Sequence, residues 1–415
     1  MTFRILIFLC LFLGTRVCIQ GQFFVVNGGQ LYSSSNSIAR CNGGFSVENN
    51  GVVNCNGQLT ITKNSTFSQQ GNLLITNGSS INNSGTIRIE QDMWNDGNFS
   101  NNQSVVEFFG NTNQQIGSNN GTVTTFHNLH LTGNAAVRTK ELVNADIQIS
   151  NAGSLQLNDR ILHTHAQTLH VFNDAVNTIT NVDLGLGFGF IASDLSGYLR
   201  WKGLNGLTYL APTGSVSPSD LYRPILYTPS GNDFFKSRLD QHNATIDGLS
   251  LGNHSNEICE ANAKFYHRFL AEGSSFTDFN LSFDPSQDGA WSSVAEYVNL
   301  WIPTGLNTNG VNSGLNWLNV ANSNYDVNEE AFVLTNSAPV ANFSVNSLDL
   351  FYNQVQFTDN STGANSWSWD FDDNTNSSVQ NPEHTFWPGD YQVLLTVSND
   401  FGCTDTATAW IHSGG

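Results

Sequence analysis

Three oxygen-bearing side chains alternate near the C-terminus of the chain, at Asp370, Asp372 and Asn374. Many calcium loops begin with carboxylate and amide oxygens at every second position. Such loops also need a glycine at the sharp turn and a distant bidentate glutamate, and both are missing here. Asp and Asn also hold turns by accepting hydrogen bonds from the local backbone. We therefore expect a structural turn at this position and no metal ion.

Two groups of histidines have part of the spacing of a zinc site. His163 and His165 share one face of a strand because side chains alternate with a period of two, and His170 follows nearby. His127 and His130 form the second group. A zinc site needs three or four ligands, and the sequence identifies no third ligand for either group. We interpret these histidines as solvated side chains and expect no metal ion or other cofactor.

Some tryptophans of residues 186–336 are candidates for stacking on sugar rings. A tryptophan on a sandwich strand more often belongs to the core, so this is the weaker interpretation. The residues that we consider for glycan stacking are Trp201, Trp301 and Trp317.

Catalytic motifs are missing from the sequence. We find no nucleophile elbow, no phosphate-binding loop and no dinucleotide fingerprint, which removes the common acyl, phosphoryl and hydride chemistries. A parallel β-helix can also be a polysaccharide lyase or hydrolase, which needs clustered acids. The acids of the N-terminal half are scattered, and we therefore expect no enzyme: Glu90, Asp92, Asp96, Glu107, Glu141, Asp146 and Asp159.

Length and charge limit the class of protein. A chain of 415 residues exceeds one ordinary domain, so two to four domains are expected. Lys and Arg total 15 against 34 Asp and Glu, for a net charge of −19. Nucleic acid and anionic membrane surfaces need a basic face that this chain cannot assemble.

The N-terminus has the pattern of a signal peptide. A basic start at Arg4 precedes the apolar run 5–13 and a small-residue exit, and this run is too short to anchor the chain in a bilayer. We predict residues 1–21 as the signal peptide, with cleavage near Gly21. No later apolar stretch could span a membrane, so we expect a secreted or cell-surface protein.

Four cysteines lie beyond the predicted cleavage point: Cys41, Cys55, Cys259 and Cys403. An oxidising compartment permits a Cys41–Cys55 disulfide that closes a short loop, although spacing alone does not determine connectivity. No pair has the CxxC spacing of a zinc site.

A short glycine-led unit recurs in residues 22–185. It begins at Gly57, Gly71 and Gly85, 14 positions apart, and weakly at Gly97, each time followed by alternating apolar residues. One unit cannot bury its apolar face alone, which favours stacking into a right-handed parallel β-helix-like β-solenoid over an antiparallel meander. One turn of the solenoid would then take two units.

Three segments within this region resemble repeats of large secreted bacterial adhesin-like proteins, many of them type IX secretion cargo. They are Val105-Val-Glu-Phe-Phe-Gly110, Gln114-Gln-Ile116 and Thr125-Phe-His-Asn-Leu-His-Leu131. The resemblance implies an architecture more than an activity.

Residues 186–336 are richer in aromatic residues and lack the repeat. Apolar strands separated by Pro and Gly predict a β-sandwich here. The expected strands are 198–202, 222–227, 234–239, 264–270, 279–283, 297–302, 315–320 and 331–334.

Residues 337–415 alternate in short strands separated by turn-forming residues, which predicts a small antiparallel sandwich. Motif residues in this segment include Trp369, Asp370, Phe371, Asp373, His384, Gly389 and Tyr391. With these motifs the segment resembles the PKD domain, an immunoglobulin-like module of extracellular proteins. The family carries glycine where this chain has Asp372 and Asn374, and both residue types tolerate a left-handed backbone.

The period of two assigns one face of the first motif strand to the core of this module. Trp367, Trp369 and Phe371 share that face, and we expect it to pack against Val393, Leu395 and Val397.

The sequence therefore predicts an all-β, non-catalytic extracellular protein with a structural or adhesive role. The repeats would act as a stiff spacer, and the two sandwiches would bind an extracellular protein or glycan. Two alternatives stay open: an accessory carbohydrate-binding protein of polysaccharide degradation, and a β-helix lyase or hydrolase.

Overall fold

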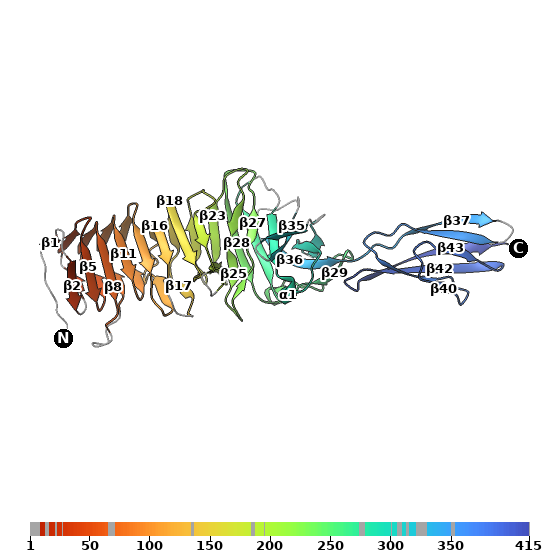
Figure 1. Ribbon diagram of the computed structural model, residues 1–415, viewed down its shortest axis with the longest axis horizontal. Helices are drawn as coiled ribbons and strands as arrows, with labels where there is room; N and C mark the ends of the chain where they lie inside the picture. Colours follow the sequence, from red (N-terminus) through yellow and green to blue (C-terminus); the bar gives the residue numbers. More distant parts are fainter. Residues whose placement is uncertain are drawn as a thin grey trace. The chain divides into compact units, whose positions relative to one another are not determined.

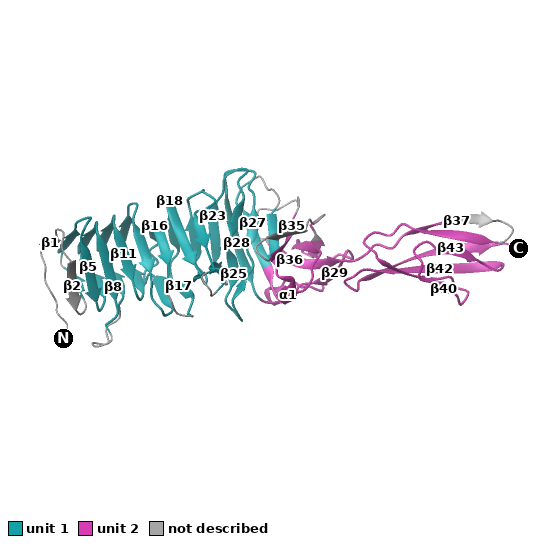
Figure 2. Ribbon diagram, in the orientation of Figure 1, with its two compact units in different colours: residues 1–241, 267–282, 324–329 teal, residues 242–266, 283–323, 330–415 magenta. Residues whose placement is uncertain are grey.

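The computed structural model describes residues 9–12, 16–20, 23–26, 28–64, 71–133, 137–183, 187–194, 196–273, 279–299, 301–304, 309–312, 315–320, 330–349 and 353–414. The predicted signal peptide lies partly outside these ranges. The chain divides into two compact units (Figure 2). Unit 1 comprises residues 1–241, 267–282 and 324–329, and unit 2 comprises residues 242–266, 283–323 and 330–415.

Unit 1 contains three sheets, A, B and C, in which neighbouring strands pair in parallel (Figure 1). Sheet A consists of β1 (Leu9–Phe12), β4 (Gln30–Ser33), β7 (Val52–Cys55), β10 (Ser80–Asn83) and β13 (Asn98–Asn101). The parallel part of sheet B consists of β2 (Arg16–Gln20), β5 (Ile38–Asn42), β8 (Gln58–Thr62), β11 (Thr86–Ile89), β14 (Val105–Phe108), β16 (Thr124–Leu131), β18 (Ile147–Asn158), β20 (Thr168–Val171) and β23 (Tyr198–Lys202), with β21 (Ile179–Asn181) beside β18. The parallel part of sheet C consists of β3 (Phe23–Val25), β6 (Phe45–Val47), β9 (Leu73–Ile75), β12 (Met93–Asn95), β15 (Gln114–Gly117), β17 (Thr139–Val143), β19 (Ile161–His163), β22 (Phe190–Ala192) and β25 (Thr213–Ser215).

Successive strands from β4 to β15 belong to sheets A, B and C in rotation, and each pairs with the third strand along the chain. In sheet B, Leu59 pairs with Ile87 and Ile61 with Ile89, so two 14-residue units separate paired residues. The pairing is parallel, so these repeats do not form the antiparallel meander. A Cβ atom on Gly85 would lie 2.0 Å from the carbonyl oxygen of Gly57, which explains the recurring glycine.

Alternation along these strands separates a buried face from an exposed one. Ile87 and Ile89 of β11 are fully buried, while Arg88 between them points outward. Arg88 forms an ion pair with Glu107 on the neighbouring β14, with 2.6 Å between Nε and Oε2. The apolar faces of the sheets therefore supply the core of unit 1, and polar pairs cover the outside.

Antiparallel strands extend these sheets toward the end of unit 1. β28 (Phe234–Asp240) pairs with β23, and β26 (Leu221–Tyr222) pairs with β25. β24 (Tyr209–Ala211), β27 (Ile225–Tyr227) and β31 (Phe279–Phe283) pair antiparallel in a further sheet, and β30 (Tyr266–Ala271) follows β28 in sheet B. An aromatic cluster of Trp201, Tyr209, Tyr227, Phe235 and Phe269 fills the space between them.

Unit 2 begins with short strands around a core that includes Tyr266, Trp301 and Val333. Its elements here are η2 (Ala244–Asp247), β29 (Ile258–Ala261), α1 (Pro285–Asp288), β32 (Ser293–Tyr297), β33 (Trp301–Pro303), β34 (Asn309–Asn312), β35 (Leu315–Val320) and β36 (Glu330–Ser337). β36 pairs antiparallel with both β29 and β32.

The C-terminal part of unit 2 is a two-sheet antiparallel sandwich. One sheet has the order β37 (Phe343–Asp349), β38 (Gln354–Asp359), β41 (Glu383–Thr385). The other has the order β40 (Asn376–Ser377), β39 (Ser366–Asp370), β42 (Gly389–Ser398), β43 (Thr404–Ser413). A disulfide joins Cys403, just before β43, to Cys259 in β29.

Strands dominate the residues that the structure describes, and the helical elements there are α1 and η2, four residues each. Within this part of the chain, none of the helices has the length and apolar character needed to cross a bilayer.

Candidate functional site

The motif strand β39 places its tryptophans as its alternation dictates. Trp369 is fully buried, and its ring centroid lies 5.0 Å from that of Phe343 and 5.3 Å from that of Phe357. Its indole Nε1 donates to the backbone oxygen of Val379 at 3.0 Å. Trp367, two residues earlier, is half-buried and packs at the edge of the same core. Phe371, Val393, Leu395 and Val397 belong to this buried cluster.

The turn after β39 is held by its own carboxylates. Asp370 Oδ1 accepts a hydrogen bond from the backbone N–H of Asp372 at 3.0 Å. Asp372 and Asn374 have φ values of +62° and +69°, the left-handed region that Asp and Asn tolerate better than most residues. Asp372 Oδ2 accepts from the backbone N–H of Gln392 at 2.9 Å, which connects the turn to β42. The contacts of these oxygens are those of a structural turn.

Asp373 connects the same turn to β41. Its Oδ2 lies 2.7 Å from Nε2 of His384, and its Oδ1 accepts from the backbone N–H of Thr375 at 3.0 Å. The His384 ring stacks on Phe371, with 4.1 Å between the centroids. Burial raises the pKa of Asp373, but the hydrogen bonds from Thr375 and His384 outweigh it, so the pKa lies below its usual value.

Gly389 and Tyr391 begin β42. Tyr391 is half-buried, and its ring centroid lies 4.8 Å from that of Phe386. Gly389 is exposed. Apart from Gly389, the motif residues thus meet around one turn and the core beside it, and their contacts serve the fold of the module.

Trp201, Trp301 and Trp317, the candidates for glycan stacking, are buried, with 0%, 0% and 5% of their surface exposed. This burial agrees with the core interpretation that the sequence favoured and contradicts the weaker interpretation of glycan stacking. Trp201, for example, lies in the aromatic cluster of unit 1, and its Nε1 donates to the backbone oxygen of Asn173 at 2.9 Å.

Two tryptophans that were not among these candidates are exposed on the PKD-like segment. Trp387 is 81% exposed and Trp410 is 60% exposed. Trp410 lies in β43 next to the buried Ile411, so the period of two along this strand would have predicted its exposure.

The predicted Cys41–Cys55 disulfide is absent from the structure, in which both cysteines are buried and neither forms a disulfide. Cys41 lies in β5 of sheet B, whereas Cys55 lies in β7 of sheet A. Each Sγ instead faces a backbone oxygen, that of Gly44 at 2.9 Å and that of Gly57 at 3.6 Å. Burial raises the pKa of Cys41 to about 12 and that of Cys55 to about 11, so both stay protonated.

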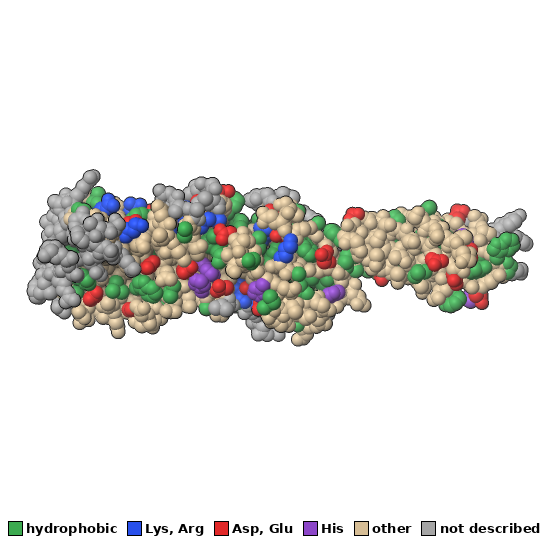
Figure 3. All heavy atoms as spheres, turned by 90° about the horizontal axis from the view of Figure 1, so that it is seen from below, with side chains coloured by type: hydrophobic (Ala, Val, Ile, Leu, Met, Phe, Trp, Pro, Cys, Tyr) green, Lys and Arg blue, Asp and Glu red, His purple; other side chains and the backbone are tan. Residues whose placement is uncertain are grey.

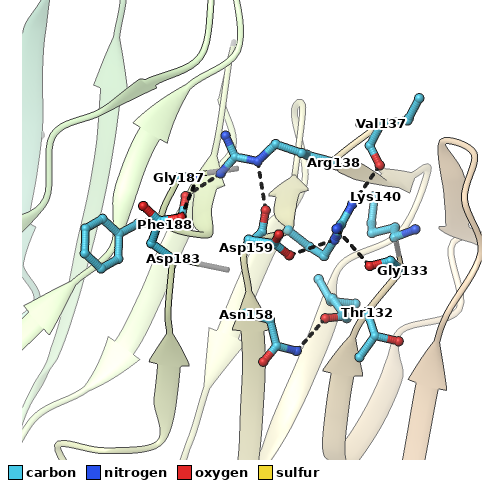
Figure 4. Close-up of polar contacts among 12 residues, drawn as sticks. Thr132, Gly133, Val137, Arg138, Lys140, Asn158, Asp159, Asp183, Gly187 and Phe188 are labelled. Atoms are coloured by element: carbon cyan, nitrogen blue, oxygen red, sulfur yellow. Dashed lines mark hydrogen bonds and ion pairs between the residues drawn. The ribbon is translucent and has the colours of Figure 1, made fainter. Parts of the chain in front are cut away.

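A buried polar network lies where the chain enters β17 and leaves β18 of unit 1 (Figure 4). The Lys140 ammonium is fully buried and donates to the backbone oxygen of Gly110 at 2.9 Å. Arg160 donates to the backbone oxygens of Gly133 and Val137 at 2.9 and 3.0 Å. Burial, with a smaller effect of the Arg160 charge, lowers the pKa of Lys140 to about 7. These cations satisfy loop carbonyls, which indicates a structural role.

The structure separates the histidine groups. His170 lies 3.1 Å from the Asp146 carboxylate, and His127 lies 3.0 Å from the Ser150 hydroxyl. His163 and His165 lie beside each other, with 3.7 Å between their ring centroids. The carboxylate of Glu141, from another strand, lies close to both rings. Burial, with a smaller effect of the His165 charge, lowers the pKa of His163 in spite of a neighbouring carboxylate.

Comparison with known proteins finds a match in the C-terminal module. The PKD domain family model matches residues 336–412. The crystal structure of the PKD1 domain of Vibrio anguillarum Epp is 34% identical over 19% of this chain and 94% of that chain, with a TM-score of 0.17. The crystal structure of the PKD1 domain from Vibrio cholerae metalloprotease PrtV is 31% identical over 19% of this chain and 99% of that chain, with a TM-score of 0.17. No curated protein matches the chain.

Proposed function

Because residues 336–412 form a PKD domain, we propose that this chain is a non-catalytic structural or adhesive protein that acts outside the cell. The PKD match carries this proposal, since the PKD domain is a binding or structural module of extracellular proteins. In this proposal, residues 1–21 direct export. The predicted cleavage near Gly21 would remove β1 and β2, after which β4 and β5 begin sheets A and B.

The three parallel sheets of unit 1 act in this proposal as a β-solenoid spacer. Each strand pairs with the equivalent strand of the next repeat, so every repeat extends the sheets by one strand separation. After cleavage, the parallel part of sheet B runs from β5 to β23 in seven steps of about 4.8 Å, or roughly 34 Å. A spacer of this kind is stiff because each strand is hydrogen-bonded to both neighbours along the stack.

The acidic groups of the repeats support a structural role for them. Glu107 is paired with Arg88 and accepts a hydrogen bond from the Thr132 hydroxyl at 2.8 Å. Asp96 accepts from the Ser118 hydroxyl at 2.8 Å and from the backbone N–H of Asn119 at 2.6 Å. A lyase or hydrolase would need such carboxylates to be directed at a substrate.

The exposed tryptophans favour the PKD domain as a surface for a protein or glycan partner. Trp387 and Trp410 expose most of their surface, and tryptophan is enriched at binding interfaces because its ring offers a large apolar area with a polar N–H. Their flat rings also suit the second candidate function, an accessory role in polysaccharide degradation through binding of sugars.

A binding experiment separates these possibilities. The full chain, the double variant Trp387→Ala/Trp410→Ala and the single variant Phe401→Ala, another exposed aromatic, would be applied to a glycan array and to immobilised extracellular matrix proteins. We expect binding by the full chain and by Phe401→Ala, and at least a tenfold loss in the double variant. Turnover of acidic polysaccharides would contradict the non-catalytic proposal, and intact extracellular protein that retains Met1 would contradict the signal peptide.

A further inference from the structure

Three successive strands of sheet C bring metal-binding side chains to one place on unit 1. Glu141 in β17 and His163 at the end of β19 are direct partners in the parallel register. His165 follows two residues later with a φ of +52°, a left-handed backbone uncommon outside glycine. Asp194 lies just after β22, and its backbone N–H donates to the oxygen of His165 at 3.2 Å.

The side chains converge. One ligand atom from each of Glu141, His163 and His165 lies within 4.8 Å of the others. Nε2 of His165 lies 3.9 Å from Oε2 of Glu141. Figure 3 shows histidine side chains gathered beside acidic ones on this face of unit 1.

Asp194 lies against both imidazole rings. Its Oδ2 lies 3.2 Å from Nε2 of His163 and 3.6 Å from Nδ1 of His165. One nitrogen of each ring thus faces this carboxylate, which leaves the other nitrogen of each ring for a further ligand. Oδ1 of Asp194 is shielded from solvent and has no hydrogen-bond partner.

We propose that Glu141, His163 and His165 bind a zinc ion, and that Asp194 orients the two imidazoles from the second shell. Two imidazoles and one carboxylate form a donor set that suits zinc, which is bound by three or four such ligands. A carboxylate on the outer N–H of a ligating histidine holds the ring in place and raises its basicity. Ca²⁺ and Mg²⁺ prefer all-oxygen ligands and fit this set poorly.

The geometry requires small movements to close around the ion. Zinc–nitrogen bonds of about 2.0 to 2.1 Å in a tetrahedral site place ligand atoms about 3.4 Å apart. The separations here, at most 4.8 Å, therefore need side-chain shifts on the order of 1 Å. Side-chain rotation of the half-buried Glu141 and His165 can supply them, because neither is locked in the core.

A zinc ion here would link β17 to β19 and the turn after it, 22 or more residues apart in the chain, and through Asp194 would also hold the segment after β22. Glu141 belongs to β17, both histidines to β19 and the turn after it, and Asp194 follows β22. Metal binding to the folded state alone stabilises that state, so zinc would strengthen this part of the parallel stack. The site thus adds a function to the spacer that its repeat pattern does not reveal.

Zinc titration of the full chain tests this proposal. The protein, without a histidine tag and after dialysis against EDTA, would be titrated with Zn²⁺ at pH 7.5 against a fluorescent zinc indicator. We expect one zinc ion per chain. His165→Asn, which keeps a residue that tolerates positive φ, and Glu141→Gln should each lower the affinity by at least about 100-fold. Asp194→Asn should weaken binding by about 10- to 100-fold, as second-shell changes do.

Matched controls make the result specific. His170→Ala removes the imidazole beside Asp146 on sheet B and should leave the affinity unchanged. Thermal unfolding of each variant without zinc would be monitored by circular dichroism. A cooperative transition would show that the variant is folded. The proposal is overturned if the full chain binds no zinc, or if His165→Asn and Glu141→Gln bind it as tightly as the unchanged chain.

Discussion

Replacing Trp369 with alanine should unfold or severely destabilise the PKD domain. Its indole is fully buried and contacts the rings of Phe343 and Phe357. Loss of a buried tryptophan side chain typically costs about 3 to 5 kcal/mol, a large share of the roughly 5 to 15 kcal/mol that stabilises a domain. The lost hydrogen bond to the Val379 oxygen adds little, because Val379 is exposed and water can replace the indole.

The assay compares two tryptophans of the same domain. A fragment of residues 336–415 carrying Cys403→Ser, which removes the thiol left by the missing Cys259, would be unfolded by heat and by urea. For a domain of this size each kcal/mol lowers Tm by about 4 to 8 °C, so Trp369→Ala should lower Tm by at least about 12 °C. Trp387→Ala, at an 81% exposed site, should change the free energy of unfolding by less than about 0.5 kcal/mol.

Equal effects of the two substitutions would refute this reasoning, because they would mean that burial does not distinguish these positions. A stable Trp369→Ala variant that has lost ligand binding would show that this side chain is a contact surface.

The remaining predictions concern the disulfide and two ionisable groups. Non-reducing peptide mapping should link Cys259 to Cys403, and a different pairing would contradict the fold of unit 2. Cys259→Ser should lower the free energy of unfolding by up to about 5 kcal/mol, because the disulfide closes a loop with a sequence separation of 144. Burial gives folded Lys140 a pKa of about 7, below its ordinary value of 10.5. The unfolded state therefore binds more protons between these two values, and the urea midpoint of unit 1 should rise with pH from about 7 to 10. Lys140→Met should flatten that rise, and an unchanged pH profile would show that another group causes it. Asp373 has a folded pKa below its usual 3.8, so its contribution to stability is present above about pH 4 and is lost as the pH falls through the folded value. Asp373→Asn should destabilise the PKD domain at pH 7 and reduce its acid sensitivity; equal acid unfolding of both forms would argue against the His384 contact.

Strand positions were predictable wherever short-range alternation is strong. The expected strands 198–202, 279–283 and 315–320 coincide with β23, β31 and β35. The PKD domain was also recognisable, because its motif residues follow one another along a short segment. The 28-residue offset between paired residues of β8 and β11 followed from two glycine-led units of 14 residues. In each case the signal lies within one strand or one repeat.

Burial of individual side chains was harder to predict, because it depends on what covers both faces of a strand. Trp201 and Trp369 both lie on alternating strands, yet the glycan interpretation expected the first to be exposed. The surrounding strands and loops that bury Trp201 come from distant parts of the chain, and strand periodicity does not report them.

The sequence by itself determined the β class, the recurring unit and the PKD domain, because these depend on residues close together in the chain. Only the tertiary structure decided which distant residues meet. It paired Cys259 with Cys403, left Cys41 and Cys55 as thiols, and set Glu141 beside His163. The reason is physical: the register of parallel strands and the packing of loops between them bring together groups that are 20 or more residues apart, and no local pattern encodes which of them will be neighbours.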